Sequence, residues 1–424
     1  MSLLSTVPAA MLALPTVLPA NASEATGEWP EYRGPGRDGS AGDAALPTTW
    51  SEDDNVRWKT AIHGRGWSSP VVLEGRVWLT TATATGERLS VLAFDAATGE
   101  VVVDRVLFEI AEPEHRNALN SYASPSACLA PGRVFVHFGT YGTACLDAKT
   151  GETLWERTDL HCDHMEGPGS SPFLHGGRLF LHLDGGDVQY LAALDPENGK
   201  TLWRRDRSFD LQPLTPDFRK AYSTPIVVIT ETADGPREEL VSSGARATYG
   251  YDPATGEELW RVLHPGFSMS SRPILVNGRV ILSTGFMRPE LWCIEPGGSG
   301  DRTKDGFVWR NTKSAPTMPS PVAYDGLLFQ VSDRGMASAV DVESGETLWR
   351  ERMGADVCAS LLLVGDLVYA FGRDGRTTVF AASPEFERVA EARLDAGFMA
   401  SPAVTGNALI LRTETHLYRI EEAR

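Results

Sequence analysis

The sequence predicts an all-β protein, an eight-bladed β-propeller made of four-stranded antiparallel blades. Three observations predict it: a recurring hairpin that ends in a Trp-basic step, a recurring Ser-Pro step before an apolar strand, and a last unit that lacks one strand. Units that recur every ~40 to 55 residues bury their apolar faces against one another. Closing such units into a ring removes most exposed strand edges.

The hairpin has the same order of residues in each copy. An apolar residue and Asp end one strand, a Thr-Gly, Asn-Gly or Ser-Gly pair forms a turn in which Gly tolerates positive φ, and Leu-Trp starts the next strand. Copies occupy residues 146–156, 194–204, 251–261 and 340–350. We expect the tryptophans of the repeat to pack between adjacent blades: Trp155, Trp203, Trp260, Trp309 and Trp349.

The second element precedes the first strand of each unit. It is a small residue followed by Ser-Pro or a variant of it, then an alternating apolar run, with proline where a strand need not donate a hydrogen bond. Its eight copies begin at Ser69, Ser124, Ser171, Thr224, Arg272, Ser320, Ser360 (where proline is lost) and Ser401. A short turn and a further strand follow most copies, so one unit comprises four strands, A to D.

The ends of the chain are expected to close the ring. The unit that starts at Ser401 has residues for strands A to C only, and a strand with the Trp-basic signature lies before the first unit, at residues 55–59. Seven blades is the alternative, if one irregular unit is an insertion. The predicted organisation is a candidate signal peptide at 1–22, an N-terminal extension at 23–54 and a single propeller domain at 55–424.

The Asp-x-x-Thr-Gly-Glu-x-Leu-Trp-Arg hairpin with its Ser-Pro strand resembles the pyrroloquinoline-quinone (PQQ)-type propeller repeat family over roughly residues 50–420. That family includes quinoprotein alcohol dehydrogenases and the non-enzymatic assembly lipoprotein BamB. The dehydrogenases carry an adjacent Cys-Cys pair over the quinone, and no two cysteines are adjacent here. We therefore expect no PQQ or other cofactor. No metal site is expected either, since His161 to His164 is too short a cluster to supply convergent ligands.

Composition limits the partners and the compartment. A formal net charge of -17 disfavours binding to nucleic acid, which needs a basic surface. An apolar run ending in Ala20-Asn21-Ala22 predicts export, to the periplasm or beyond, although no Lys or Arg precedes it; without cleavage the protein would be cytoplasmic. No other stretch is long and apolar enough to span a membrane. A monomer is expected.

The candidate site lies on the rim built from the D-to-A and B-to-C connections, where the sequence varies most. An arginine arc, Arg246, Arg272, Arg288, Arg334 and Arg373, facing aromatic side chains would suit a carboxylate, a phosphate or an acidic peptide. The alternative is that each arginine pairs with a local Asp, as Arg334 with Asp333. The candidate ligand-binding residues are Trp67, His115, Arg116, Tyr122, His164, Tyr222, Arg246, Arg272, Arg288, Asp333 and Arg334.

Two functions follow from this site. The favoured one is an exported binding or scaffold propeller that recognises a peptide or a small acidic ligand at the rim. The alternative is an enzyme, either a degenerate quinoprotein dehydrogenase or a carbohydrate-active hydrolase or lyase. The enzyme hypothesis requires His164, Tyr122 and Arg272 to converge on one pocket.

Overall fold

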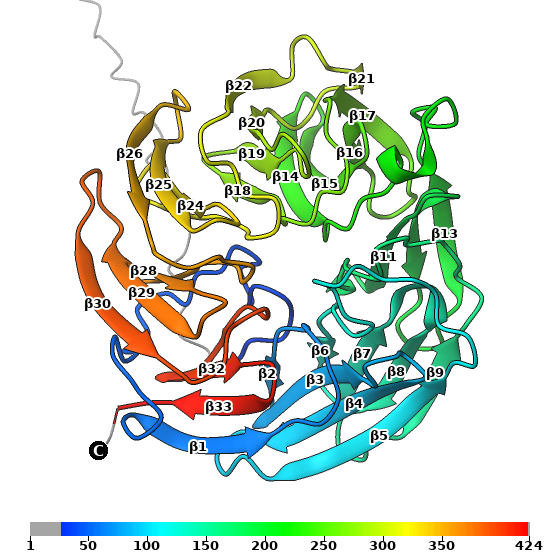
Figure 1. The fold of residues 1–424 in the computed structure, drawn as a ribbon. Coiled ribbons are helices and arrows are strands. Elements are labelled where there is room, and N and C mark those ends of the chain that lie inside the picture. Colours follow the sequence, from blue (N-terminus) through cyan, green and yellow to red (C-terminus); the bar gives the residue numbers. More distant parts are fainter. Residues whose placement is uncertain (1–26, 423–424) are drawn as a thin grey trace, which may run out of the picture.

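The computed structural model describes residues 27–422 and shows a ring of eight antiparallel β-sheets around a central channel (Figure 1). The predicted eight-bladed propeller is confirmed. The candidate signal peptide at 1–22 lies outside the described residues. Within the described part of the chain, no helix is long and apolar enough to cross a membrane.

The blades are numbered along the chain, with strand A nearest the channel. Blade 1 contains β2 (Val71–Leu73), β3 (Arg76–Ala82), β4 (Arg88–Asp95) and β5 (Val101–Glu109). Blade 2 contains β6 (Cys128–Ala130), β7 (Arg133–His137), β8 (Thr143–Asp147) and β9 (Thr153–Arg157). Blade 3 contains β10 (Phe173–His175), β11 (Arg178–Asp184), β12 (Gln189–Leu194) and β13 (Thr201–Asp206). Blade 4 contains β14 (Ile226–Thr232), β15 (Gly235–Gly244), β16 (Ala247–Tyr251) and β17 (Glu258–Leu263), with the short β21 (Gly300–Asp301) parallel to β17.

The second half of the ring repeats the pattern. Blade 5 contains β18 (Ile274–Val276), β19 (Arg279–Ser283), β20 (Leu291–Ile294) and β22 (Phe307–Asn311). Blade 6 contains β23 (Val322–Tyr324), β24 (Leu327–Val331), β25 (Met336–Asp341) and β26 (Thr347–Arg352). Blade 7 contains β27 (Leu362–Val364), β28 (Leu367–Phe371), β29 (Arg376–Ala381) and β30 (Arg388–Arg393). Two short 3-10 helices, η1 (Gly139–Tyr141) and η2 (Pro216–Phe218), lie in loops.

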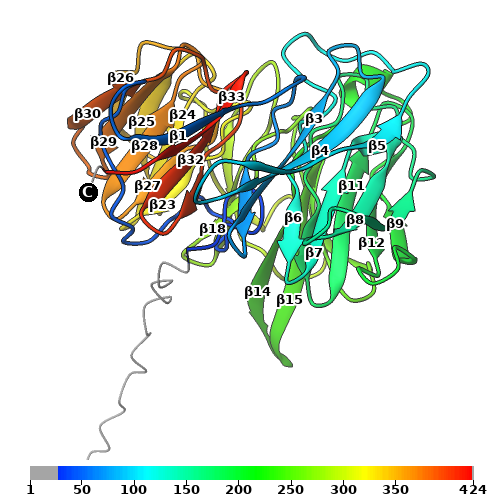
Figure 2. The ribbon, with the colours of Figure 1, turned by 90° about the horizontal axis from the view of Figure 1, so that it is seen from below.

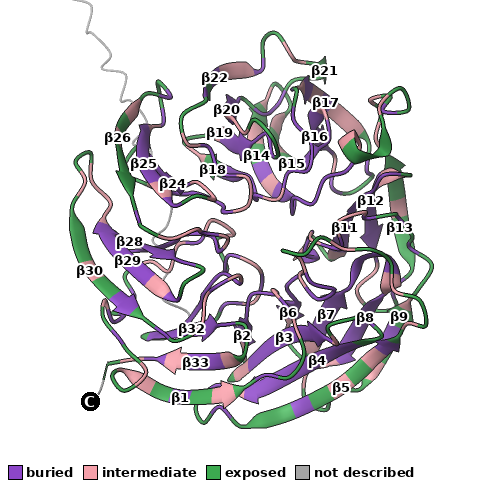
Figure 3. Ribbon diagram, viewed as in Figure 1, coloured by how far each residue is buried: buried purple, intermediate pink, exposed green. Residues whose placement is uncertain are grey.

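Blade 8 joins the two ends of the chain, as predicted. It contains β31 (Ala403–Thr405), β32 (Ala408–Arg412), β33 (His416–Ile420) and, as its outermost strand, β1 (Val56–Ala61). Strand β1 pairs antiparallel with β33, with Ala61 opposite His416 (Figure 1). The outer strands of the blades are mostly exposed and the inner strands buried (Figure 3).

The repeated tryptophans join neighbouring blades. Trp203 of blade 3 donates its indole N–H to Pro253 O of blade 4 at 3.2 Å, and a Cβ on Gly256 would lie 2.6 Å from the Trp203 ring. The turn glycine is therefore required twice, for its φ of +71° and for its missing side chain. The same ring-on-glycine contact joins Trp58 with Gly99, Trp155 with Gly199, and Trp309 with Gly345.

Trp260 is an exception in its hydrogen bond. Its indole N–H donates to the buried Glu239 carboxylate of its own blade at 2.6 Å. The ring still packs against blade 5, in one buried cluster with Val280 and Leu282. Packing between blades is thus confirmed for this tryptophan too.

A ring of hydroxyl groups encircles the channel at the start of the A strands. The N–H of the residue at this position in one blade donates to the hydroxyl oxygen at the same position in the next, at 2.8 to 3.1 Å over seven links. We call this set the hydroxyl ring: Ser69, Ser126, Ser171, Thr224, Ser320, Ser360 and Ser401. It is open at Arg272, which carries no hydroxyl. In blade 2 the member is Ser126, not the Ser124 of the predicted element.

Residues 29–42 of the N-terminal extension lie inside the ring, against the A strands (Figures 1 and 2). Trp29 exchanges two backbone hydrogen bonds of 2.8 Å with Val72 of blade 1, and Pro30 O accepts from Leu129 N of blade 2 at 2.8 Å. Toward the end of the segment, Ala41 N donates to Leu363 O of blade 7 at 2.9 Å. This segment spans the channel and ties together strands from most of the ring.

Candidate functional site

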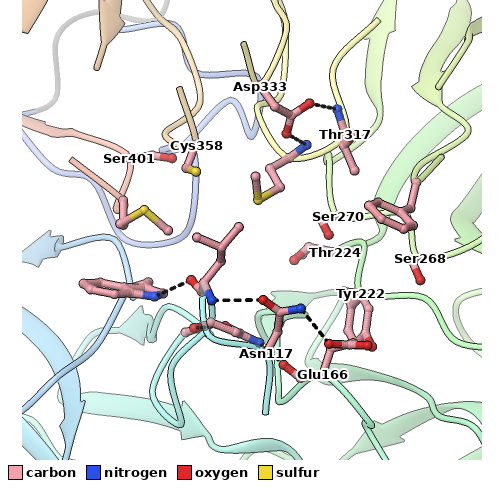
Figure 4. A pocket seen from close by; sticks show the side chains of 18 of the residues that line it. Asn117, Glu166, Tyr222, Thr224, Ser268, Ser270, Thr317, Asp333, Cys358 and Ser401 are labelled. Atoms are coloured by element: carbon pink, nitrogen blue, oxygen red, sulfur yellow. Dashed lines mark hydrogen bonds between the residues drawn. The ribbon is translucent and has the colours of Figure 1, made fainter. Parts of the chain in front are cut away.

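A cavity of about 730 Å³ opens at the mouth of the channel, on the rim formed by the D-to-A and B-to-C loops (Figure 4). Residues from every blade line it, so its shape depends on the closed ring. Its walls combine an apolar part, a charged part and a floor that includes five members of the hydroxyl ring. This is the same rim on which we predicted the candidate site from the sequence.

The N-terminal segment forms part of the floor. Tyr32 lines the cavity, and its hydroxyl lies 2.9 Å from Ser360 Oγ and 3.4 Å from Ser320 Oγ. Arg33 is buried behind it and donates to Ser320 O at 3.2 Å. The cavity is therefore closed at its inner end by the protein's own chain.

Arg272 holds this segment and does not reach the cavity. Its side chain is 0% exposed, and it donates to Tyr32 O at 2.6 Å and to Pro225 O at 3.0 Å. It also forms an ion pair with Glu31 at 3.3 Å. Burial lowers the pKa of this guanidinium, and the neighbouring Glu31 carboxylate opposes that shift.

Apolar side chains from five blades line part of the cavity, and we call them the apolar collar. It consists of Trp67, Leu119, Phe286, Met287, Met318 and Met399. Phe286 and Met287 lie in the B-to-C loop of blade 5 and are 57% and 68% exposed, and Leu119 is 45% exposed. Trp67 is fixed by donating its indole N–H to Leu119 O at 2.9 Å.

One charged wall is built around Lys220. Its side chain is 3% exposed, and its ammonium group pairs with Asp217 and, at 3.3 Å, with Glu166. Asn117 donates to the second Glu166 oxygen at 2.8 Å, which links the loops before blades 2, 3 and 4 (Figure 4). These groups satisfy one another, so this wall is a fixed structure.

The opposite wall carries Asp333, Arg334, Asp356 and Arg373. Asp333 accepts two backbone N–H groups, from Thr317 at 2.7 Å and Met318 at 3.1 Å (Figure 4). Arg334 pairs with Asp356 at 3.1 Å. The expected local pairing of Arg334 with Asp333 is thus replaced by pairing with the next blade.

Of the candidate residues, the structure brings four to the cavity: Trp67, Tyr222, Asp333 and Arg334. Tyr222 donates its hydroxyl hydrogen to His164 O at 2.7 Å, and burial raises its pKa. His164 itself lies behind Tyr222, buried, where its Nε2 accepts the Thr140 N–H at 3.1 Å.

The other candidates lie away from the cavity. Tyr122 is buried and donates to Glu114 O at 2.8 Å, with the Arg116 guanidinium 5.2 Å from its ring centre. Arg246 stacks at 5.6 Å on Phe218 and Phe267. His115 and Arg288 are exposed and do not line the cavity. The arginine arc is therefore reduced to Arg334 and Arg373 at this site.

The sequence did not single out Tyr32, Lys220 or Cys358 as site residues, nor the five members of the hydroxyl ring that line the cavity. The signal for the ring was present, because a Ser or Thr recurs before strand A in most units. Strand A is innermost, so these hydroxyls converge on the axis. Cys358 is the half-buried member of five free cysteines, and burial raises its pKa to about 12.

A family model described as outer membrane protein assembly factor BamB matches residues 40–158, 115–261 and 245–385. The chain belongs to this family of PQQ-like propellers. BamB of Yersinia pestis is 24% identical over 44% of the chain, and tetrathionate hydrolase of Acidithiobacillus ferrooxidans is 22% identical over 54%. The chain spans about half the length of these two relatives, 48% of each.

Solved structures share the fold at low identity. BamB from Moraxella catarrhalis has a TM-score of 0.59 at 12% identity, over 86% of this chain and 99% of that one. A quinohemoprotein alcohol dehydrogenase from Comamonas testosteroni has a TM-score of 0.52 at 14% identity, over 96% and 82% of the two chains. At such low identities the similarity shows only the propeller fold. What this chain binds has to be inferred from its own residues.

Proposed function

We propose that the protein is an exported binding propeller that holds a polypeptide segment at the mouth of its channel. An apolar side chain of that segment enters the cavity, and the apolar collar surrounds it. The observation that carries this proposal is the exposure of Phe286 and Met287, 57% and 68%, at the edge of a cavity of about 730 Å³.

The chemistry of the collar supports a polypeptide. Large apolar side chains grouped at an opening favour contact with a partner over contact with water. Methionine adapts to side chains of different shape, and three methionines belong to the collar. The family description, an outer membrane protein assembly factor, points to a protein partner outside the cytoplasm.

We further propose that binding requires no quinone and that the protein acts as a monomer. Support for the first point comes from the donors at the cavity. Among the described residues that line the cavity, Cys358 is the only cysteine, so there is no adjacent pair to cover a quinone. Asp333 already accepts backbone N–H groups and Asp356 already pairs with Arg334. The trio required by the enzyme hypothesis gives no support to catalysis here, because His164, Tyr122 and Arg272 do not line the cavity.

The test uses a pool of random heptapeptides with free ends. The purified protein is mixed with the pool, separated by gel filtration, and the retained peptides are sequenced. We expect enrichment of Phe, Leu and Met among the retained peptides. Phe286→Asp and Met287→Asp should each lower retention at least about tenfold, a loss of about 1.4 kcal/mol.

A matched control is Leu202→Asp, because Leu202 is 50% exposed on an outer strand far from the opening. This variant should retain peptides as the parent protein does. If no peptides are retained, or if Met287→Asp retains them unchanged, the proposed function is wrong.

A further inference from the structure

Five members of the hydroxyl ring form the floor of the cavity: Ser69, Ser126, Ser171, Thr224 and Ser401. Each is at most 7% exposed. Each oxygen accepts a backbone N–H from the preceding blade, which fixes its position. None of the five donates its hydroxyl hydrogen to an acceptor among the described residues. Ser401 and Thr224 project toward the cavity from opposite sides (Figure 4).

The other two members of the ring differ in this respect. The oxygens of Ser320 and Ser360 both lie within hydrogen-bond distance of the Tyr32 hydroxyl. The N-terminal segment thus occupies one side of the ring, and the remaining hydroxyls face the cavity. Buried hydroxyl groups with unused hydrogens are costly unless a ligand or water accepts them.

The cavity lining carries four carboxylates and three cations, and one of these cations is free to pair with an anionic acceptor. Among the described residues that line the cavity, Arg373 forms no ion pair, whereas Lys220 is paired with two carboxylates and Arg334 with Asp356. The carboxylates of the cavity are occupied in the same pairs or, for Asp333, by two backbone N–H groups. A ligand that brings negative charge therefore meets unused donors.

We propose that the floor binds the C-terminal carboxylate of the polypeptide whose apolar side chain occupies the collar. This inference rests on the proposed function. A carboxylate only accepts hydrogen bonds, which matches a set of hydroxyl donors and one guanidinium. Because residues 29–42 lie across the inner end of the channel, an entering chain has no way through. A chain end fits such a cavity better than the middle of a chain.

The test compares two heptapeptide pools of the same random composition, one with free C-terminal carboxylates and one with C-terminal amides. We expect the free-acid pool to be retained at least about tenfold more by the parent protein. Equal retention of both pools, with both still lost in Met287→Asp, overturns the carboxylate inference and leaves the proposed function standing. Retention of amidated peptides enriched in Asp or Glu also overturns it. Retention of neither pool overturns both proposals.

Variants in the wall and in the floor test the assignment. Arg373→Gln should weaken binding of the free acids severalfold and leave that of the amides unchanged, whereas Arg288→Gln, on the same rim but outside the cavity, should change neither. Thr224→Val removes a floor hydroxyl, and Thr224→Ser keeps it; only the first should lose selectivity for the free acid. If Thr224→Val fails to fold, the Arg373 and Arg288 pair decides the matter, and an unchanged preference in Arg373→Gln contradicts the inference.

Discussion

The Arg272 guanidinium of blade 5 donates to the Tyr32 carbonyl oxygen across 2.6 Å. Arg272 stands where the other blades place a Ser or Thr, so the one open link of the hydroxyl ring is also an attachment point for the N-terminal segment. The Tyr32 hydroxyl group lies 2.9 Å from Ser360 Oγ. Together these contacts make a segment outside the repeats part of the cavity floor.

Replacing Arg272 should destabilise the fold. Arg272→Ala leaves the Glu31 carboxylate, whose side chain is 8% exposed, without its Arg272 partner, and removes the donor to Tyr32 O. Loss of one partner of a buried pair costs about 3–5 kcal/mol. Urea unfolding at neutral pH measures this cost.

The control is Arg279→Ala, which breaks an ion pair with Glu343 on the surface, where the two side chains are 27% and 62% exposed. Its expected cost is about 0–1 kcal/mol. Equal midpoints for the two variants would contradict the role given to Arg272.

The turn glycines should differ in how well they tolerate alanine. Gly256 and Gly278 have φ values of +71° and +75°, but a Cβ meets the Trp203 ring at 2.6 Å only at Gly256. Gly278→Ala should cost about 1–2 kcal/mol from the backbone alone. Gly256→Ala should cost roughly 1–3 kcal/mol more, because the indole has to move.

Thermal unfolding of both variants checks this difference, and replacing Trp203 by Leu in the Gly256→Ala background should recover part of the loss. A Gly256→Ala variant as stable as Gly278→Ala would show that the ring-on-glycine contact does not constrain the blades.

The sequence predicted the blades well because their determinants are local. Because the Thr-Gly turn and the tryptophan lie a few residues apart, each hairpin can be predicted from its own short stretch of sequence. The register of blade 2 was predicted two residues early, because Ser124 is followed by proline while the ring position belongs to Ser126. The pairing of Cys128 with Phe135 sets that register.

The candidate site was predicted less well because its determinants are distant in sequence. Residues 29–42 carry no repeat, and their hydrogen-bond partners come from six blades, as with Leu129 and Leu363. The sequence near Arg272 does not say which way its side chain turns, and in the structure it pairs with Glu31 instead of reaching the rim. The replacement of Ser by Arg at this one position was the available signal.

Stability should fall as the pH is lowered from neutral. Burial lowers the pKa of His137 and His264 to about 3 and that of His164 to about 4, from a usual value of 6.5. Between about pH 6.5 and pH 4, the unfolded chain binds protons that the folded protein excludes, so the stabilisation present above pH 6.5 is lost on acidification. Three such groups give a slope of up to about 4 kcal/mol per pH unit.

Urea unfolding at several pH values between 7.5 and 4.5 measures this slope. His137→Gln, which keeps a polar group near Thr143 Oγ1, should reduce the slope by about one third. Stability that stays constant or rises on acidification would contradict the burial of neutral histidines.

Site-specific photo-crosslinking at the collar shows directly whether a polypeptide binds at the channel mouth. Benzoylphenylalanine replaces Phe286 in one sample and Leu202 in another, and each is irradiated with the free-acid heptapeptide pool and analysed by mass spectrometry. We expect many more peptides linked to position 286 than to position 202. Equal labelling at the two positions, or none at position 286, would contradict a polypeptide site at the channel mouth.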